Sequence, residues 1–173
     1  MKLFKQVLLA LAFVLPTCFV TSCGDDDEPE IKPEAIASEI SFEGITTVHS
    51  TTDPSATFTT NASTYTFTLD EKNQVADLKI GKAKFMEAMP ELDMDFNDIN
   101  YTTTETAINF SCTTLTPEIG GRPFPQFPIT ELSGAVKTSV VNNKYTPASI
   151  ELTFICTWNG TPFNIVFKGT PKK

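Results

Sequence analysis

Residues 150–167 read IELTFICTWNGTPFNIVF and carry the clearest structural signal in the chain. Apolar and polar side chains alternate on both sides of Asn159-Gly160, a dipeptide typical of two-residue β-hairpin turns. A two-residue loop there sets Phe154 opposite Ile165, so the apolar faces of the two strands coincide. The stretch therefore predicts an antiparallel hairpin with one apolar and one polar face.

Two further hairpins follow from the same matching of faces. A three-residue loop at 142–144 sets Val136 opposite Ile150 and Leu132 opposite Phe154. A four-residue loop from Asp70 to Asn73 sets Phe67 opposite Ala76. The 26 threonines and 14 phenylalanines also favour strands, because branched and aromatic side chains fit a pleated surface. We predict an all-β domain over residues 37–173, an antiparallel meander of about eight or nine strands that forms a barrel or strongly curved sheet.

The first 22 residues do not belong to this domain. Lys2 and Lys5 precede an apolar run that is too short to span a bilayer, which is the order of a secretory signal. The run ends in Val20-Thr21-Ser22-Cys23, which resembles a bacterial lipobox. The resemblance implies cleavage before Cys23, acylation of Cys23 and attachment to the membrane through lipid.

An acidic run, Asp25-Asp26-Asp27-Glu28, follows the cysteine almost directly. It resembles the export signal of Bacteroidetes lipoproteins, which implies display on the outer face of the outer membrane. Residues 23–36 are otherwise polar and contain Pro29 and Pro33, so they are expected to form a flexible acidic tether. The two interpretations, signal and solvated spacer, are compatible.

Charge and histidine content exclude several classes of function. The formal net charge is -8, whereas binding to nucleic acid phosphates needs clustered Lys and Arg. The single histidine, His49, excludes multi-histidine metal sites and leaves few routes to nucleophile-histidine catalysis. No phosphate-binding loop is present either, so we expect a domain that is not an enzyme and needs no cofactor.

Three segments of the predicted β-domain together carry a family resemblance. They are Met89-Pro90 with the acidic and apolar residues that follow, Gly120-Gly121-Arg122-Pro123-Phe124-Pro125, and the closing run from Phe163 to Thr170. This pattern resembles the calycin-like β-barrel lipoproteins of Bacteroidetes. The resemblance implies a lipocalin-like antiparallel barrel and supplies no catalytic residues.

Aromatic residues are the first candidate site. Tyr65, Phe67, Phe154 and Trp158 lie on predicted apolar faces, where they either line a cavity for one small apolar ligand or fill the core. The Pro-rich loop around Phe124 and Phe127 is either a lid or contact surface, or a crossover packed on the barrel end.

Cysteines and carboxylates are the other candidates. Cys112 and Cys156 are expected in the core, either as a disulfide or as two free thiols. Asp93, Asp95 and Asp98, with Glu87 and Glu91 nearby, begin like a calcium loop. However, Asp98 and Thr104 stand where that loop needs Gly and Glu, so the polar face of a strand is the favoured interpretation and no metal is expected.

Two functions remain open. The first is a surface-anchored module whose barrel binds a small apolar or amphipathic ligand. The alternative is a solid-core interaction protein that docks on an outer-membrane protein assembly.

Overall fold

The computed structural model describes residues 35–53 and 55–173, and its regular elements are all β-strands. Eight strands are long enough to span the sheet, and three are short additions. The strands are β1 (Glu39–Ser50), β2 (Thr57–Thr60), β3 (Thr64–Asp70), β4 (Val75–Ala83), β5 (Leu92–Thr103), β6 (Ala107–Leu115), β7 (Glu118–Ile119), β8 (Arg122–Pro123), β9 (Ile129–Val141), β10 (Lys144–Trp158) and β11 (Thr161–Pro171).

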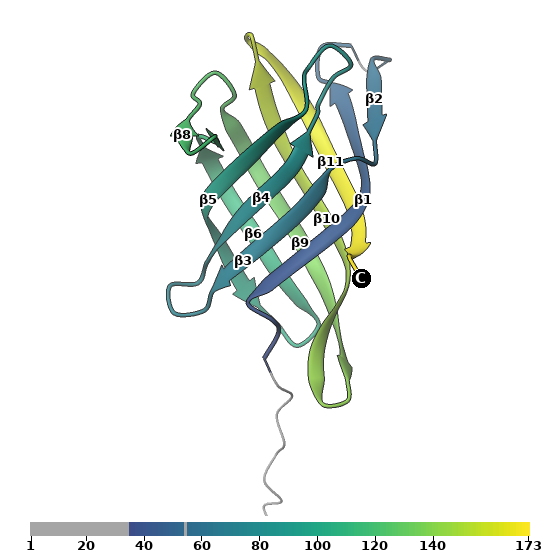
Figure 1. Ribbon diagram of the computed structural model, residues 1–173, viewed down its shortest axis with the longest axis vertical. Helices are drawn as coiled ribbons and strands as arrows, with labels where there is room; N and C mark the ends of the chain where they lie inside the picture. Colours follow the sequence, from purple (N-terminus) through teal and green to yellow (C-terminus); the bar gives the residue numbers. More distant parts are fainter. Residues whose placement is uncertain (1–34, 54) are drawn as a thin grey trace, which may run out of the picture. The chain divides into compact units, whose positions relative to one another are not determined.

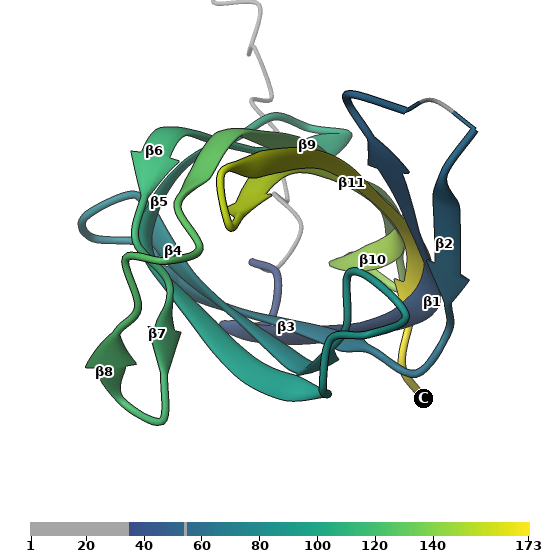
Figure 2. The ribbon, with the colours of Figure 1, turned by 90° about the horizontal axis from the view of Figure 1, so that it is seen from above.

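The eight long strands close into an antiparallel barrel (Figures 1 and 2). Each pairs with its neighbour in sequence, in the order β1, β3, β4, β5, β6, β9, β10 and β11, and β11 then pairs with β1. The short β2 extends the sheet beside β1, and β7 and β8 form a small hairpin beside β5. The predicted all-β meander and its barrel closure are therefore confirmed.

The hairpin that decided the fold has the predicted register. Asn159 and Gly160 form a two-residue turn with φ angles of 49° and 77°, in the left-handed region that Asn and Gly tolerate. Phe154 lies opposite Ile165, and Trp158 lies opposite Thr161.

The loop between β9 and β10 differs from the three-residue prediction. Val141 pairs with Lys144, so the turn has two residues, Asn142 and Asn143, both with positive φ. A bulge at Ala148 then shifts the register by one, and this shift restores the predicted pairing of Val136 with Ile150. The predicted faces are right, but a bulge rather than a longer loop produces them.

A second bulge on β9 replaces the predicted pairing of Leu132 with Phe154. The ladder steps from Ser133 opposite Thr153 to Thr130 opposite Ile155, so Glu131 and Leu132 together oppose Phe154. Glu131 has φ 55°, and Leu132 is still buried. The bulge therefore bends β9 while it keeps the apolar side chain in the core.

The β3–β4 hairpin has four loop residues, as predicted, but they run from Glu71 to Gln74. Phe67 therefore lies opposite Leu78 rather than Ala76, which is a register shift of two residues. Since side chains alternate with a period of two, every residue keeps its predicted face. The Asp70 carboxylate accepts hydrogen bonds from Asn73 and from the Lys72 amide, which lower its pKa and hold the turn one residue later.

Large side chains fill the barrel interior. Tyr65 stacks on Phe167 with ring centroids 3.7 Å apart, and Phe67 stacks on Phe110 at 4.4 Å. Phe154 meets Phe96 edge to face at 5.5 Å. These residues are fully or almost fully buried, so the barrel has a solid aromatic core.

The predicted signal peptide (1–22), Cys23 and the acidic run Asp25 to Glu28 lie outside the described residues. Of the predicted tether, Ala35 and Ile36 are described and form no strand. Within the described ranges, no helix is long and apolar enough to cross a membrane.

Candidate functional site

The four aromatic residues predicted as a cavity lining do not share one site. Tyr65, Phe67 and Phe154 are buried in the core described above, in contact with other rings. Trp158 is half-buried at one end of the barrel, 5.4 Å from the Phe127 ring. The filled-core alternative therefore describes the first three residues, and Trp158 belongs to a separate cluster.

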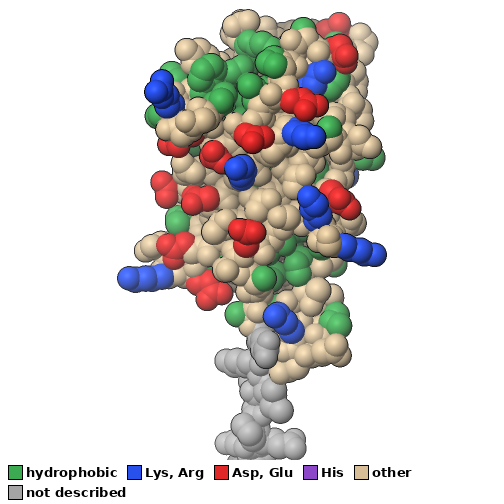
Figure 3. Space-filling model, in the orientation of Figure 1, with side chains coloured by type: hydrophobic (Ala, Val, Ile, Leu, Met, Phe, Trp, Pro, Cys, Tyr) green, Lys and Arg blue, Asp and Glu red, His purple; other side chains and the backbone are tan. Residues whose placement is uncertain are grey.

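That cluster closes the end of the barrel where β10 meets β11, which we call the aromatic end. Phe124 stacks on Phe127 at 5.2 Å, and Phe127, which is buried, tilts against Trp158. Hydrogen bonds from the Phe124 amide to the Pro117 carbonyl and from the Phe127 amide to the Phe124 carbonyl hold the loop. The Pro-rich loop is thus a crossover packed on the barrel end, and Figure 3 shows hydrophobic side chains gathered at the end that carries β8.

A small apolar pocket lies at the same end, between β1, β2, the start of β11 and the loop after β4. Its volume is about 160 Å³. The side chains that give it its apolar character are Val48, Phe58, Phe85, Met86 and Phe163. The Lys84 Nζ atom lies 5.7 Å from the centroid of the Phe58 ring, which is a cation–π distance, at the rim of the pocket. Sequence reasoning missed this pocket, because its residues come from four separate segments.

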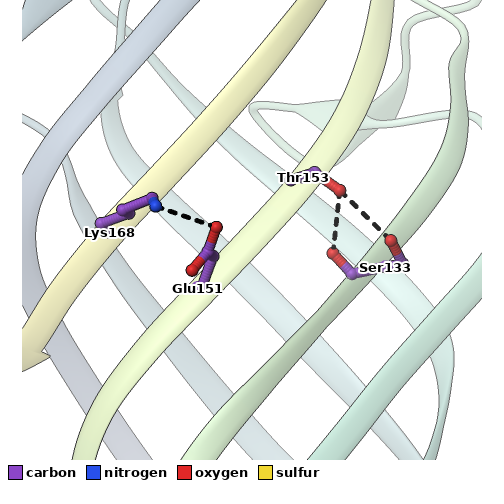
Figure 4. A network of polar contacts seen from close by, with 4 residues as sticks. All are labelled: Ser133, Glu151, Thr153 and Lys168. Atoms are coloured by element: carbon purple, nitrogen blue, oxygen red, sulfur yellow. Dashed lines mark hydrogen bonds and ion pairs between the residues drawn. The ribbon is translucent and has the colours of Figure 1, made fainter.

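The outer wall of the barrel carries a wider hollow, the outer groove, of about 640 Å³ across β5, β6, β9, β10 and β11. Its lining is rich in hydroxyls, including Ser111, Ser133 and Thr153. Ser133 Oγ lies 3.2 Å from Thr153 Oγ1, beside the bulge at Glu131 (Figure 4). The sequence shows the alternation of small polar residues. However, the hollow depends on the bulge at Glu131, and no glycine stands at that position to signal a bulge.

An ion pair crosses the neighbouring part of the same wall. Lys168 Nζ lies 3.0 Å from Glu151 Oε1, and the two side chains are 65% and 60% exposed (Figure 4). At that exposure solvent screens the pair, so it adds little to stability.

The carboxylates predicted on the polar face of a strand are found there. Asp93 is exposed and Asp95 half-exposed on β5, and the buried Met94 and Phe96 alternate with them. Asp93 Oδ1 accepts a hydrogen bond from the Lys82 amide at 3.0 Å, and the Asp98 amide donates to Asp77 Oδ1 at 3.1 Å. Glu87 and Glu91 are exposed outside the strand. Among the described residues, no three His, Cys, Asp or Glu side chains are grouped to hold a metal.

Cys112 and Cys156 are both free, so the disulfide alternative is wrong, and only Cys156 lies in the buried core. Cys112 lies beside Leu132 on one side of β9, and Cys156 lies beside Ile129 on the other. One strand therefore separates them, and their partners on β9 are three residues apart, so their Cα atoms are separated by more than two strand spacings, or roughly 9.5 Å, which is beyond the reach of a disulfide. Burial raises the pKa of the Cys156 thiol to about 12. Cys112 is only half-buried, and its Sγ contacts the Thr114 carbonyl.

The one histidine is exposed on β1. Its Nδ1 lies 3.3 Å from Thr57 Oγ1 of β2. Cys23 and the residues Asp25, Asp26, Asp27 and Glu28 lie in the part of the chain that the structure does not describe.

The chain shows little similarity to known proteins. No protein-family model matches the chain, and no curated protein matches it. A similar solved structure is that of a provisionally assigned outer membrane protein from Bacteroides fragilis NCTC 9343. The two chains share 16% identity, and the match has a TM-score of 0.49 over 78% of this chain and 50% of the other. The chain thus corresponds to half the length of that protein.

Proposed function

We propose that the chain is a lipoprotein of the outer membrane, anchored through Cys23 and facing the cell exterior, whose barrel is a non-catalytic interaction module of the calycin-like type. The observation that carries this choice is the packing of the core. Ring centroids of Tyr65, Phe67 and Phe154 lie 3.7 to 6.3 Å from those of the neighbouring rings, which leaves no ligand-sized space between these rings. A partner or ligand would therefore bind on the outer wall or at the ends of the barrel.

The location rests on the sequence. A charged and then apolar leader that ends in Thr21-Ser22-Cys23 resembles a lipoprotein signal, and Asp25 to Glu28 resembles a surface-export signal. Two or three acyl chains hold a protein stably, whereas one holds it only marginally. The closed antiparallel barrel has the architecture that the calycin-like resemblance implies.

The aromatic end is the surface best suited to a protein partner. Pro123 and Pro125 are exposed and Phe124 is half-buried, so apolar surface is presented by a stiff, packed loop. Surfaces of this kind, with little conformational entropy to lose, favour protein association.

Replacing the lipidated cysteine tests the anchor. In Cys23→Ser the acyl chains have no attachment point, so we expect the protein to move from the membrane fraction to the soluble fraction of lysed cells. Cys112→Ser is the matched control and should stay with the membrane, because Cys112 lies within the barrel. Continued membrane attachment of Cys23→Ser would overturn the lipoprotein proposal.

The direction that the barrel faces is read from the same cells. Added protease should degrade the wild-type barrel on intact cells, and replacing Asp25 to Glu28 by Asn and Gln should protect it while leaving it in the membrane fraction. Equal protease sensitivity of both proteins would sink the export assignment and leave the lipid anchor intact.

A second function has one observation in its favour, the apolar pocket at the aromatic end. At about 160 Å³ it has room for a small apolar group, not for a long lipid chain. The corresponding expectation is a persistent added mass in native mass spectra of protein purified from its own cells. Ala56→Phe, which puts a ring at the pocket rim, should remove that mass, and Ala148→Phe on the β9–β10 hairpin should not. Spectra without any added mass would contradict ligand binding, and the interaction module would remain as the single proposed function.

A further inference from the structure

The β9–β10 hairpin extends beyond the rest of the barrel. The last β9 residue paired with β6 is Lys137, and the first β10 residue paired with β11 is Ile150. Residues 139–146 therefore pair only with one another, and Figure 1 shows them as a projection below the barrel. At about 3.3 Å per residue, Val141 lies roughly 13 Å beyond Lys137, the last β9 residue that pairs with β6.

Each face of this projection carries an exposed valine near the tip. Val140 and Val141 are 51% and 50% exposed, and adjacent strand residues point to opposite faces. Tyr145 lies opposite Val140, and Lys144 lies opposite Val141. The two exposed valines are therefore available for contact with a less polar surface from either face of the ribbon.

Charge distinguishes the hairpin from most of the domain. The residues from Leu132 to Ile150 include Lys137 and Lys144 and no acid, in a chain with 21 acids and 13 bases. Figure 3 likewise shows hydrophobic and basic side chains on the lower projection. Acids do lie at this end of the barrel, namely Glu39, Asp70, Glu71 and Glu105, but on other strands and loops.

The described chain enters the barrel at the same end. Ser38 accepts a hydrogen bond from the Leu69 amide, and Glu39 pairs with Thr68, close to the β3–β4 turn. Residues 24–34 separate Cys23 from Ala35, and eleven residues reach at most about 40 Å. A lipid anchor on Cys23 therefore holds this end of the barrel within that distance of the bilayer.

We propose that the hairpin tip, Val140 to Tyr145, docks on the lipid surface that holds Cys23, with Val140 and Val141 in the interface and Lys137 and Lys144 against anionic headgroups. This inference rests on the proposed lipid anchor and adds an orientation to it. The turn supports it, because Asn142 and Asn143 at φ 52° and 58° make a tight two-residue turn that presents both valines. The aromatic end then points away from the membrane.

Tryptophan fluorescence of the lipidated full-length mature protein tests the docking. The natural Trp158 lies at the far end of β10 and reports on the aromatic end. The variant Val141→Trp with Trp158→Phe moves the single tryptophan to the tip. In vesicles of phosphatidylcholine and phosphatidylglycerol that contain brominated lipid, we expect at least half of the tip fluorescence to be quenched, with a blue shift, and less than one tenth of the Trp158 fluorescence.

The outcomes separate the docking from the anchor. Flotation of the protein with the vesicles tests the anchor by itself. Co-flotation with an unquenched tip tryptophan overturns the docking while the anchor stands. A blue shift without bromine quenching also overturns it, because the tip would then contact protein rather than lipid.

A measurement on the unmodified tip guards against a folding defect in the double variant. Trypsin cleavage after Lys144 of the wild-type protein should slow at least fivefold on vesicles relative to detergent micelles that bind only the acyl chains. Val140→Asn with Val141→Asn should abolish that protection and leave circular dichroism unchanged. Equal cleavage rates of the wild type in both settings would contradict the proposal.

Discussion

Gly44→Ala is expected to destabilise the barrel by on the order of 3 kcal/mol, the upper end of what overpacking usually costs. Gly44 lies on β1 directly opposite Gly169 on β11, at the contact that closes the barrel. A Cβ atom at residue 44 would lie 2.1 Å from the Lys168 carbonyl oxygen and 2.5 Å from the Gly169 Cα. Both are backbone atoms, so the clash is relieved only if the two strands move apart.

Gly81→Ala is the matched control. Gly81 lies in β4, and an added Cβ would meet its nearest atom, Asp93 Oδ1, at 3.9 Å, which is ordinary contact. Its change in unfolding free energy should stay within about 1 kcal/mol, since loss of glycine entropy in the unfolded chain partly offsets any strain. Urea unfolding followed by circular dichroism measures both. A Gly44→Ala protein as stable as Gly81→Ala would mean that the closing contact is looser than described.

Tyr65→Ala is expected to cost about 3–5 kcal/mol, the range for removal of a large buried aromatic side chain. The ring is fully buried on Phe167, and its hydroxyl lies 3.1 Å from Thr46 Oγ1, which is also buried. Tyr65→Phe keeps the stack and removes only that hydrogen bond, so it should cost about 1–3 kcal/mol. Tyr145→Phe on the exposed hairpin controls for loss of a hydroxyl and should cost less than about 0.5 kcal/mol.

The same residue contributes to alkaline unfolding. Burial raises the pKa of Tyr65 above its ordinary value, with the Thr46 hydrogen bond opposing that effect. The neutral phenol therefore stabilises the folded state fully below about pH 10, and this stabilisation is lost as the pH rises above that value. The fall in unfolding free energy from pH 9 to 11.5 should be shallower in Tyr65→Phe. An unchanged slope would assign the loss to other groups, of which the buried Cys156 thiol, with a pKa raised to about 12, is one.

Much of the fold was predictable because the faces of the strands are strongly specified. Asn159-Gly160 set one register correctly, and the alternation around Phe67 kept the correct face even where the register moved by two residues. The bulges were not predictable. Glu131, Asp98 and Ala148 are ordinary strand residues in the sequence, and only pairing across the closed barrel forces the extra residue. Matching the apolar faces of β9 and β10 therefore predicts one extra residue in the turn, whereas the extra residue is the bulge at Ala148.

The candidate sites were less predictable, because they depend on which segments meet. The alternation showed that Tyr65, Phe67 and Phe154 face inward, but hollow and filled barrels share that pattern. The Phe124 loop had both interpretations open, and the contact from Phe127 to Trp158 decides for packing. Gly44 is a usable signal in the sequence for the closing contact, since a glycine inside a strand often marks a close approach of two backbones.

The pairing of β1 with β11 has a consequence for how the protein is made. Gly44 and Gly169 are 125 residues apart in sequence, so the closing contact forms only after nearly the whole domain has been synthesised. Until then both β1 and the growing edge of the meander are open, and long-range closure of this kind is slow. The delay is compatible with the proposed export, because a domain that cannot close early remains unfolded enough to be translocated. The cost is a period of exposed strand edges, which can pair with other chains before the barrel closes.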